Sequence, residues 1–345
     1  VNIKILLSAA LEAHEIDMDE RNTLLEAMTE EVALLVLRNN YAQTQALALA
    51  VDRAPSLIHH HSRAMRQLER SYGLDRELEH LPGDEEIAER ISRGQGLTRP
   101  ELAVLLAHSK ISTYQILLES DVPEDPFLGE DLQRYFPQAL SPRFDRFMAP
   151  HRLRREIIAT HVTNSMINRV GSGFTLRMNE LTGGLPADTA RAYAAVREIF
   201  RLRELWREIE ALDHQVASKT QKELMHETRQ LLERATAWML RHRQRPIDIA
   251  ATVAEFRGGV DKLRLSFPRA LAASNRLTQK RRVRRYLNAD VPATLANHVA
   301  ALAALTSALD IADVANSREH DIAQVATVYF DTGDRLGLHW LSDHI

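Results

Sequence analysis

Residues 195–212 read AVREIFRLRELWREIEAL, and the spacing of their large apolar side chains decides the fold class. These side chains recur every three or four positions, which is the period of an α-helix and not of a β-strand. They are Val196, Ile199, Leu202, Trp206, Ile209 and Leu212. Neither proline nor glycine occurs between Pro186 and Arg243. The stretch is therefore predicted to form a packed helical seam.

A single helix over residues 186–243 would be on the order of 85 Å long at 1.5 Å per residue. We therefore expect a turn inside it, near Asp213–Ser218, where the apolar periodicity weakens. The sequence from Ser218 to Gln221 has the pattern of a capping box, which marks the start of a new helix. Residues 186–245 are thus predicted to form a long antiparallel helical hairpin.

Helical periodicity also dominates the N-terminal part of the chain. A helix beginning after Asp17 or Asp19 is expected to carry one apolar seam, followed by a helix over Tyr41–Arg53. Thr98 and Glu101 predict a second capping box, which opens a further helix. The residues expected on the buried sides of these helices are Leu24, Met28, Val32 and Leu35, and then Leu102, Leu105, Leu106, Ile111 and Leu117.

Proline punctuation suggests how the chain is divided. Five prolines between residues 123 and 150 break it into short pieces, whereas an alanine-rich helix from Pro292 to about Ala315 and a final helix near Asp321–Gly333 are expected later. We predict an all-α, multi-helix protein with four parts. These are residues 1–122, a proline-rich connector over 123–185, the hairpin over 186–245 and a helical subdomain over 246–345.

Composition excludes several classes of protein. The 345 residues include no cysteine, which excludes disulfides, thiolate metal sites and a cysteine nucleophile. No apolar run reaches the roughly 18 to 20 residues that span a bilayer, and the start is no signal peptide. We therefore expect a cytoplasmic protein without a membrane partner. Because residue 1 is a valine that leads straight into an apolar run, the chain is expected to be part of a longer one.

Few residues suggest a catalytic, metal-binding or cofactor-binding role. His59, His60 and His61 are consecutive, so on a helix they point about 100° apart and cannot face one metal ion together; we interpret them as surface histidines. Gly171 and Gly173 form a Gly-x-Gly, but a helix is predicted before them and the third glycine of a dinucleotide loop is missing, which favours a helix C-cap. We assign no catalytic, cofactor-binding or metal-binding residue to this chain.

One stretch is strongly basic. Between Arg241 and Arg285, thirteen Lys or Arg face three Asp or Glu, although the whole chain has a formal net charge of -3. The charge is densest at Lys280, Arg281, Arg282, Arg284 and Arg285. Such a patch is typical of a polyanion-binding surface.

The alternative, which we favour, is a basic face that pairs with acidic surface of the same protein, because the first forty residues hold eight acids against three bases. Net charge argues against nucleic acid as a partner.

The residues Gly96-Leu-Thr-Arg-Pro-Glu-Leu-Ala-Val-Leu-Leu-Ala-His-Ser-Lys-Ile111 resemble the large NAD-specific glutamate dehydrogenases of bacteria. Further stretches that resemble this family are Val1–Leu7, Asn168–Gly171, Trp238–Arg243, Ser307–Ala312, Val328–Phe330 and Arg335–Leu341. One departure is His108, where the family often has an aromatic residue.

The resemblance implies a helical C-terminal segment of a very long chain. The family oxidises L-glutamate to 2-oxoglutarate and ammonia with NAD as the hydride acceptor, and its catalytic lysine, aspartate and NAD loop are expected upstream of Val1. It also implies that this segment holds no cofactor and is inactive alone. The expected partners are the catalytic and regulatory domains of the same enzyme, in a homo-oligomer, with a structural or regulatory role for this segment.

Overall fold

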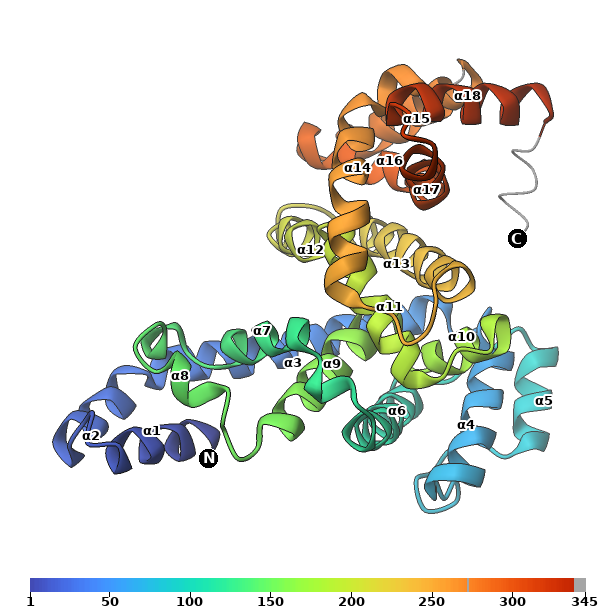
Figure 1. The fold of residues 1–345 in the computed structure, drawn as a ribbon. Helices are drawn as coiled ribbons and strands as arrows, with labels where there is room; N and C mark the ends of the chain where they lie inside the picture. The colour runs from blue at the N-terminus through green and yellow to red at the C-terminus, as the bar shows by residue number, and fades with distance from the viewer. Residues whose placement is uncertain (272, 338–345) are drawn as a thin grey trace. The chain divides into compact units, whose positions relative to one another are not determined.

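A computed structural model describes residues 1–271 and 273–337, and these residues form eighteen α-helices, two short 3-10 helices and no strand (Figure 1). The predicted all-α class is confirmed. The chain divides into two compact units, an N-terminal unit of residues 1–190 and a C-terminal unit of residues 191–345. The finer division into four parts stays a prediction.

The N-terminal unit contains ten α-helices and both 3-10 helices before α11. They are α1 (Asn2–Glu12), α2 (Met18–Ala27), α3 (Thr29–Arg53), α4 (Ile58–Tyr72), α5 (Asp84–Ser92), α6 (Arg99–Glu119), η1 (Val122–Glu124), α7 (Pro126–Tyr135), η2 (Gln138–Leu140), α8 (Asp145–Met148), α9 (Arg154–Val170) and α10 (Phe174–Thr182). Helix α6 packs on α9, α3 and α4, and its Leu102 and Leu105 are buried against Met65 and Leu68 of α4 in one cluster.

The capping box at Thr98 forms as predicted, and the Thr98 backbone N–H donates to Glu101 Oε2 at 2.6 Å. Four of the five predicted core residues of α6 are buried. Ile111 is the exception, since 53% of it is exposed, so its place on the buried side was wrongly predicted. Further differences lie in α3, which runs unbroken through the expected boundary before Tyr41, and in Leu35, which is exposed.

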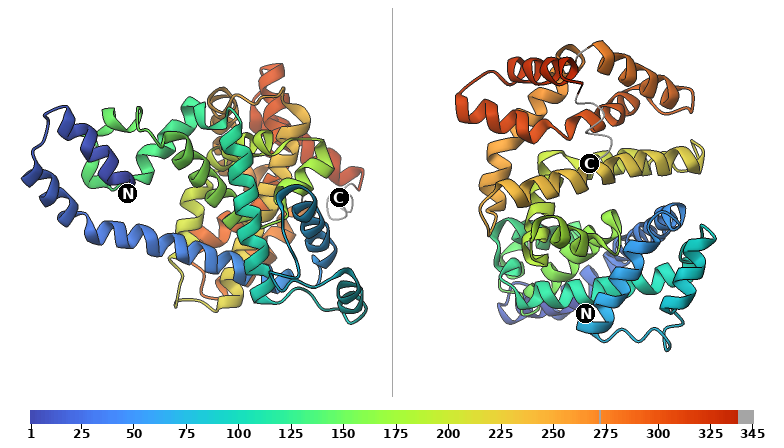
Figure 2. Two further views of the ribbon diagram at one scale, coloured as in Figure 1. Left: turned by 90° about the horizontal axis from the view of Figure 1, so that it is seen from below. Right: turned by 90° about the vertical axis from the view of Figure 1, so that its right-hand side faces the viewer.

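Helix α11 (Pro186–Ile199) crosses the boundary between the units, and seven α-helices follow it in the C-terminal unit. These are α12 (Leu202–Glu210), α13 (Ser218–His242), α14 (Ile249–Ala270), α15 (Ala273–Leu287), α16 (Ala293–Leu305), α17 (Ala308–Arg318) and α18 (Ile322–Arg335). The ribbon of this unit is coloured from yellow-green to red in Figure 2. Helix α14 packs on α17 and α18, while α16 packs on α13 and α15.

The predicted seam is helical but interrupted. Arg201 adopts a left-handed conformation with φ 51°, which ends α11 and starts α12, so the arm before the turn is not one continuous helix. The turn over residues 211–217 lies where it was expected, and Trp206 Nε1 of α12 donates to Thr228 Oγ1 of α13 at 3.1 Å. The long antiparallel hairpin as a whole stays a prediction.

The capping box predicted at Ser218 does not form. Ala217 is the N-cap of α13 and makes no side-chain cap bond. The Gln221 amide instead donates to Ile209 O at 2.9 Å and to Asp213 Oδ1 at 2.6 Å. Gln221 therefore links α13 to the end of α12 instead of closing a cap.

The alanine-rich region is two helices, not one. Helices α16 and α17 are bent by 69° relative to each other. No single described helix is long and apolar enough to cross a membrane, and only this bent pair together reaches that length and composition. Their small and branched side chains, including Val299, Ala300, Ile311 and Ala312, are buried in the C-terminal unit. Packing between helices therefore accounts for their apolar composition.

Candidate functional site

The predicted basic patch lies on α15, whose aromatic Tyr286 anchors it because that side chain is 1% exposed. Two of the five predicted patch residues turn toward acids of α13. The Arg282 guanidinium donates to Glu227 Oε1 at 2.7 Å, and that of Arg285 lies 3.4 Å from Glu223 Oε2. Part of the patch is thus an internal ion-pair network that joins α15 to α13.

The other three predicted patch residues, Lys280, Arg281 and Arg284, are exposed. No acidic side chain among the described residues pairs with them. A shallow hollow of about 230 Å³ runs along this side of α15, lined by Arg276, Gln279, Lys280, Val283, Arg284 and Leu287. Its cations and apolar floor suit contact with an acidic partner.

The three consecutive histidines lie on α4 and face different surroundings. His59 is exposed, whereas His61 is buried, so the interpretation of all three as surface residues was wrong for His61. His59 lines a cleft of about 300 Å³ between α4 and α5 together with Arg63, Arg66 and Asp84. Within the described ranges, no three His, Asp or Glu side chains are grouped so that they could hold a metal ion.

Both arginines of this cleft form ion pairs. Arg66 lies 3.3 Å from Asp84, and Arg63 lies 3.1 Å from Glu180 of α10. An anionic ligand would have to compete with carboxylates that already neutralise the two guanidinium groups. The cleft therefore carries no net positive field that would favour an anion.

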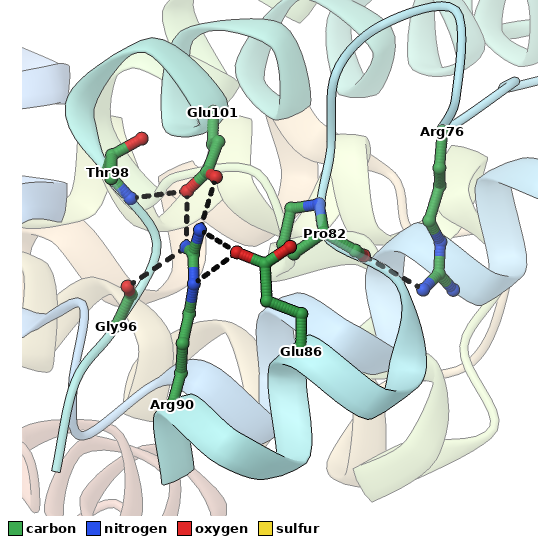
Figure 3. A network of polar contacts seen from close by, with 7 residues as sticks. All are labelled: Arg76, Pro82, Glu86, Arg90, Gly96, Thr98 and Glu101. Carbon is green, nitrogen blue, oxygen red and sulfur yellow. Dashed lines mark hydrogen bonds and ion pairs between the residues drawn. The ribbon is translucent and has the colours of Figure 1, made fainter. Parts of the chain in front are cut away.

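A polar network ties α5 to the start of α6 (Figure 3). Arg90 donates to both carboxylate oxygens of Glu101, at 2.6 and 2.8 Å, and also to Glu86 and to the carbonyl of Gly96. The hydrogen bond to Glu101 raises the pKa of Arg90 above its usual value. Both oxygens of Glu101 accept hydrogen bonds from Arg90, which supports a structural role for the pair.

One buried group, the side-chain amine of Lys110, was not indicated by the sequence. The Nζ of Lys110, on α6, is inaccessible to solvent and has no hydrogen-bond partner among the described residues. Burial lowers the pKa of Lys110 to about 8. The periodicity of α6 gave no sign of this because Lys110 is only partly buried as a residue, and only its amine end is enclosed.

The glycine pair acts as the sequence predicted. Gly171, with φ 82°, is the C-cap of α9, and Gly173 precedes the first turn of α10. A helix and not a strand comes before the pair, so the backbone does not have the geometry of a dinucleotide loop. Trp206 and Trp238 are both buried, whereas Trp340 lies outside the described residues.

Two protein-family models match the chain. The model described as "Glutamate dehydrogenase, C-terminal" matches residues 94–345, and that described as "Bacterial NAD-glutamate dehydrogenase, catalytic domain" matches residues 1–50. The second match means that α1, α2 and most of α3 are similar to part of a catalytic domain, although the sequence suggested a segment that follows one.

Curated relatives agree with these matches. NAD-specific glutamate dehydrogenases from Pseudomonas aeruginosa, Halomonas elongata and Mycobacterium tuberculosis are 44%, 38% and 36% identical to the chain, over 100%, 100% and 98% of it. The chain spans 21% of the length of each of these relatives. The chain therefore belongs to the bacterial NAD-specific glutamate dehydrogenase family and corresponds to its C-terminal helical region.

Proposed function

We propose that this chain is the helical C-terminal part of an NAD-dependent glutamate dehydrogenase, which converts L-glutamate to 2-oxoglutarate and ammonia in the cytoplasm. The observation that carries the proposal is the match of residues 94–345 to the C-terminal model, together with relatives that are named NAD-specific glutamate dehydrogenases. The catalytic groups and the NAD site belong to the rest of the longer protein in this proposal, and this segment holds no cofactor.

The proposed role of the segment is structural. It supports the catalytic and regulatory domains and the assembly of a homo-oligomer. Its ion-pair networks, at Arg90–Glu101 and at Arg282–Glu227, favour a rigid scaffold over a reactive site. A regulatory role is the second possibility within the same proposal.

The test compares the full-length enzyme with a version that ends at residue 93, because the match to the C-terminal model begins at residue 94 and the catalytic-domain match covers residues 1–50. Glutamate-dependent NADH formation and the particle mass from light scattering are measured for both. We expect the shortened enzyme to lose assembly and activity together. An unchanged particle mass with altered kinetics would favour a regulatory role, and NADH formation by the 345-residue chain alone would overturn the proposal.

A second proposal concerns the exposed half of the basic patch. Lys280, Arg281 and Arg284 are proposed to contact acidic surface of the same enzyme. Replacing the three by Ser should weaken assembly of the full-length enzyme at low salt, and raising the salt should weaken the wild type in the same way. The alternative, a polyanion site, predicts that polyphosphate binds the wild-type chain with a steep dependence on salt and does not bind the variant.

A further inference from the structure

The middle of α3 is an apolar helical segment that is exposed on every side. Residues 33–40, here called the exposed α3 segment, are all accessible to solvent. Four consecutive large apolar side chains lie in it, with exposed fractions of 65% for Leu34, 37% for Leu35, 55% for Val36 and 61% for Leu37. Single exposed leucines are ordinary, but a contiguous group of four marks a surface that normally meets another protein.

Both ends of the segment are held in place. On its N-terminal side, the Glu31 carboxylate accepts a hydrogen bond from the Gln138 backbone N–H at 2.6 Å. On its C-terminal side, Arg169 donates to Gln45 Oε1 at 3.0 Å, and Ala46 and Leu49 are buried. About 12 Å of helix, at 1.5 Å per residue over eight residues, therefore bridges two anchored regions without packing of its own.

The arrangement of the four side chains indicates what kind of surface could cover them. Successive residues of an α-helix point about 100° apart, so Leu34, Leu35, Val36 and Leu37 project around nearly the whole circumference. A flat partner would cover only one or two of them. The covering structure must therefore surround the helix on several sides, as the core of a domain does.

The catalytic-domain match bears on which structure covers the segment. That model matches residues 1–50, so it includes the whole exposed α3 segment, whereas the C-terminal model begins at residue 94. A stretch that belongs to a domain buries its apolar side chains against the other parts of that domain. A lipid bilayer does not fit, because the apolar run, residues 32–37, is only six residues long and the charged residues Glu31 and Arg38 flank it directly.

We propose that the exposed α3 segment is an internal docking helix, which the remainder of the catalytic domain of the same enzyme encloses in the full-length protein. The C-terminal region would then be fixed to the catalytic domain through a shared hydrophobic core and not through a flexible linker. This inference rests on the proposed function, since it names the surface through which the segment supports the catalytic domain.

Cysteine labelling tests this proposal, because the chain contains no cysteine of its own. Leu34→Cys and Leu37→Cys are made separately in the 345-residue chain and in the full-length enzyme. The rate of maleimide labelling is read at the introduced cysteine by peptide mass spectrometry, so other cysteines of the longer protein do not interfere. Leu78→Cys is the matched control, since Leu78 is a leucine of the same unit, is 74% exposed and lies outside residues 1–50.

We expect labelling at positions 34 and 37 to be at least tenfold slower in the full-length enzyme than in the 345-residue chain. Labelling at position 78 should differ by less than twofold. Equal rates at position 34 in both proteins would overturn the proposal. Slower labelling of the 345-residue chain as its own concentration rises would also overturn it, because a second copy would then be the covering structure.

Glutamate-dependent NADH formation by the wild-type full-length enzyme is measured in parallel. An active enzyme whose position 34 stays reactive would contradict the docking helix and leave the proposed function standing. An inactive wild-type enzyme with a protected position 34 would contradict the proposed function and not the docking surface. The two failures are therefore distinguishable.

Discussion

Arg90 and Glu101 form a bidentate ion pair in which only 15% and 12% of the two side chains are exposed. Glu101 also closes the capping box of α6, because its Oε2 accepts from the Thr98 backbone N–H at 2.6 Å (Figure 3). One carboxylate thus fixes the start of α6 and its junction with α5. Although burial alone would raise its value, the hydrogen bonds from Arg90 and Thr98 outweigh burial and lower the pKa of Glu101.

Replacing Glu101 by Gln should lower the free energy of unfolding by about 2 kcal/mol, because it leaves the guanidinium of Arg90 largely buried without its bidentate partner. Urea unfolding followed by circular dichroism measures the change. The matched control is Glu89→Gln, which breaks the solvent-exposed pair between Glu89 of α5 and the C-cap residue Arg93 and should cost less than about 0.5 kcal/mol. Equal losses in the two variants would contradict a special role for Glu101.

Acid should also affect the two forms of position 101 differently. The folded pKa of Glu101 is lowered, so the stabilisation by its carboxylate is present above the unfolded value and is lost as the pH falls through the folded value. Glu101→Gln has no carboxylate to protonate at this position. We therefore expect the difference in unfolding free energy between wild type and variant to shrink as the pH is lowered from 6 toward 3, and a constant difference would refute this reasoning.

Gly96 is a position where a single added methyl group should strongly destabilise the fold. A Cβ there would lie 2.2 Å from the carbonyl carbon of Ala54 and 2.5 Å from the nitrogen of Pro55, and both are backbone atoms that cannot rotate away. Gly96→Ala should therefore lower the free energy of unfolding by about 3 kcal/mol. The control is Gly83→Ala, where the added Cβ meets nothing within 4 Å and the cost should stay below about 1 kcal/mol. Thermal unfolding measures both losses, and equal losses in the two variants would contradict the prediction.

Local sequence patterns predicted the fold class and those caps whose partners lie nearby. The capping box of Thr98 and Glu101 forms because both partners lie within one helical turn. The similar pattern at Ser218 fails because Gln221 finds acceptors at Ile209 and Asp213, on the other side of a turn. The sequence alone could not show this competition, which depends on how α12 packs against α13.

For the candidate site, the sequence predicted only that basic residues are concentrated there, and not which of them form ion pairs. The sequence identified the basic residues of α15, but it did not separate Arg282 and Arg285, which pair with α13, from Lys280 and Arg284, which stay exposed. The acids concerned lie more than fifty residues away, so no spacing rule connects them. For the same reason, the exposure of Leu35 could not be foreseen from a periodicity that placed it on a packed seam.

His298 of α16 should make the C-terminal unit sensitive to mild acid. Burial, together with the nearby charge of Arg264, lowers the pKa of His298 to about 4. Between about pH 6.5 and pH 4, the unfolded chain takes up a proton at this histidine that the folded chain does not, so stability falls as the pH falls through this range.

The variant His298→Gln removes this effect. Between pH 7.5 and pH 5, its unfolding free energy should fall by roughly 1 to 2 kcal/mol less than that of the wild type, as follows from about 1.4 kcal/mol per pH unit. Urea unfolding at a series of pH values gives the slopes. His320→Gln, at an exposed position of the same unit, should keep the wild-type slope. A wild-type slope in His298→Gln would mean that this histidine is protonated in the folded protein.

Lys110 should destabilise the protein at neutral pH, because its amine is enclosed without a hydrogen-bond partner among the described residues and burial lowers its pKa to about 8. Replacing it by Met keeps the aliphatic length and removes the charge, so the free energy of unfolding at pH 7 should rise by roughly 1 to 3 kcal/mol. The exposed Lys4→Met, in the same unit, should change it by less than about 0.5 kcal/mol. Between about pH 8 and pH 10.5 the unfolded chain binds a proton that folded Lys110 has released, so the wild type gains stability as the pH rises. The difference in unfolding free energy between Lys110→Met and the wild type should therefore shrink over this range. A variant less stable than the wild type at pH 7 would show that the amine has a partner that stabilises its charge.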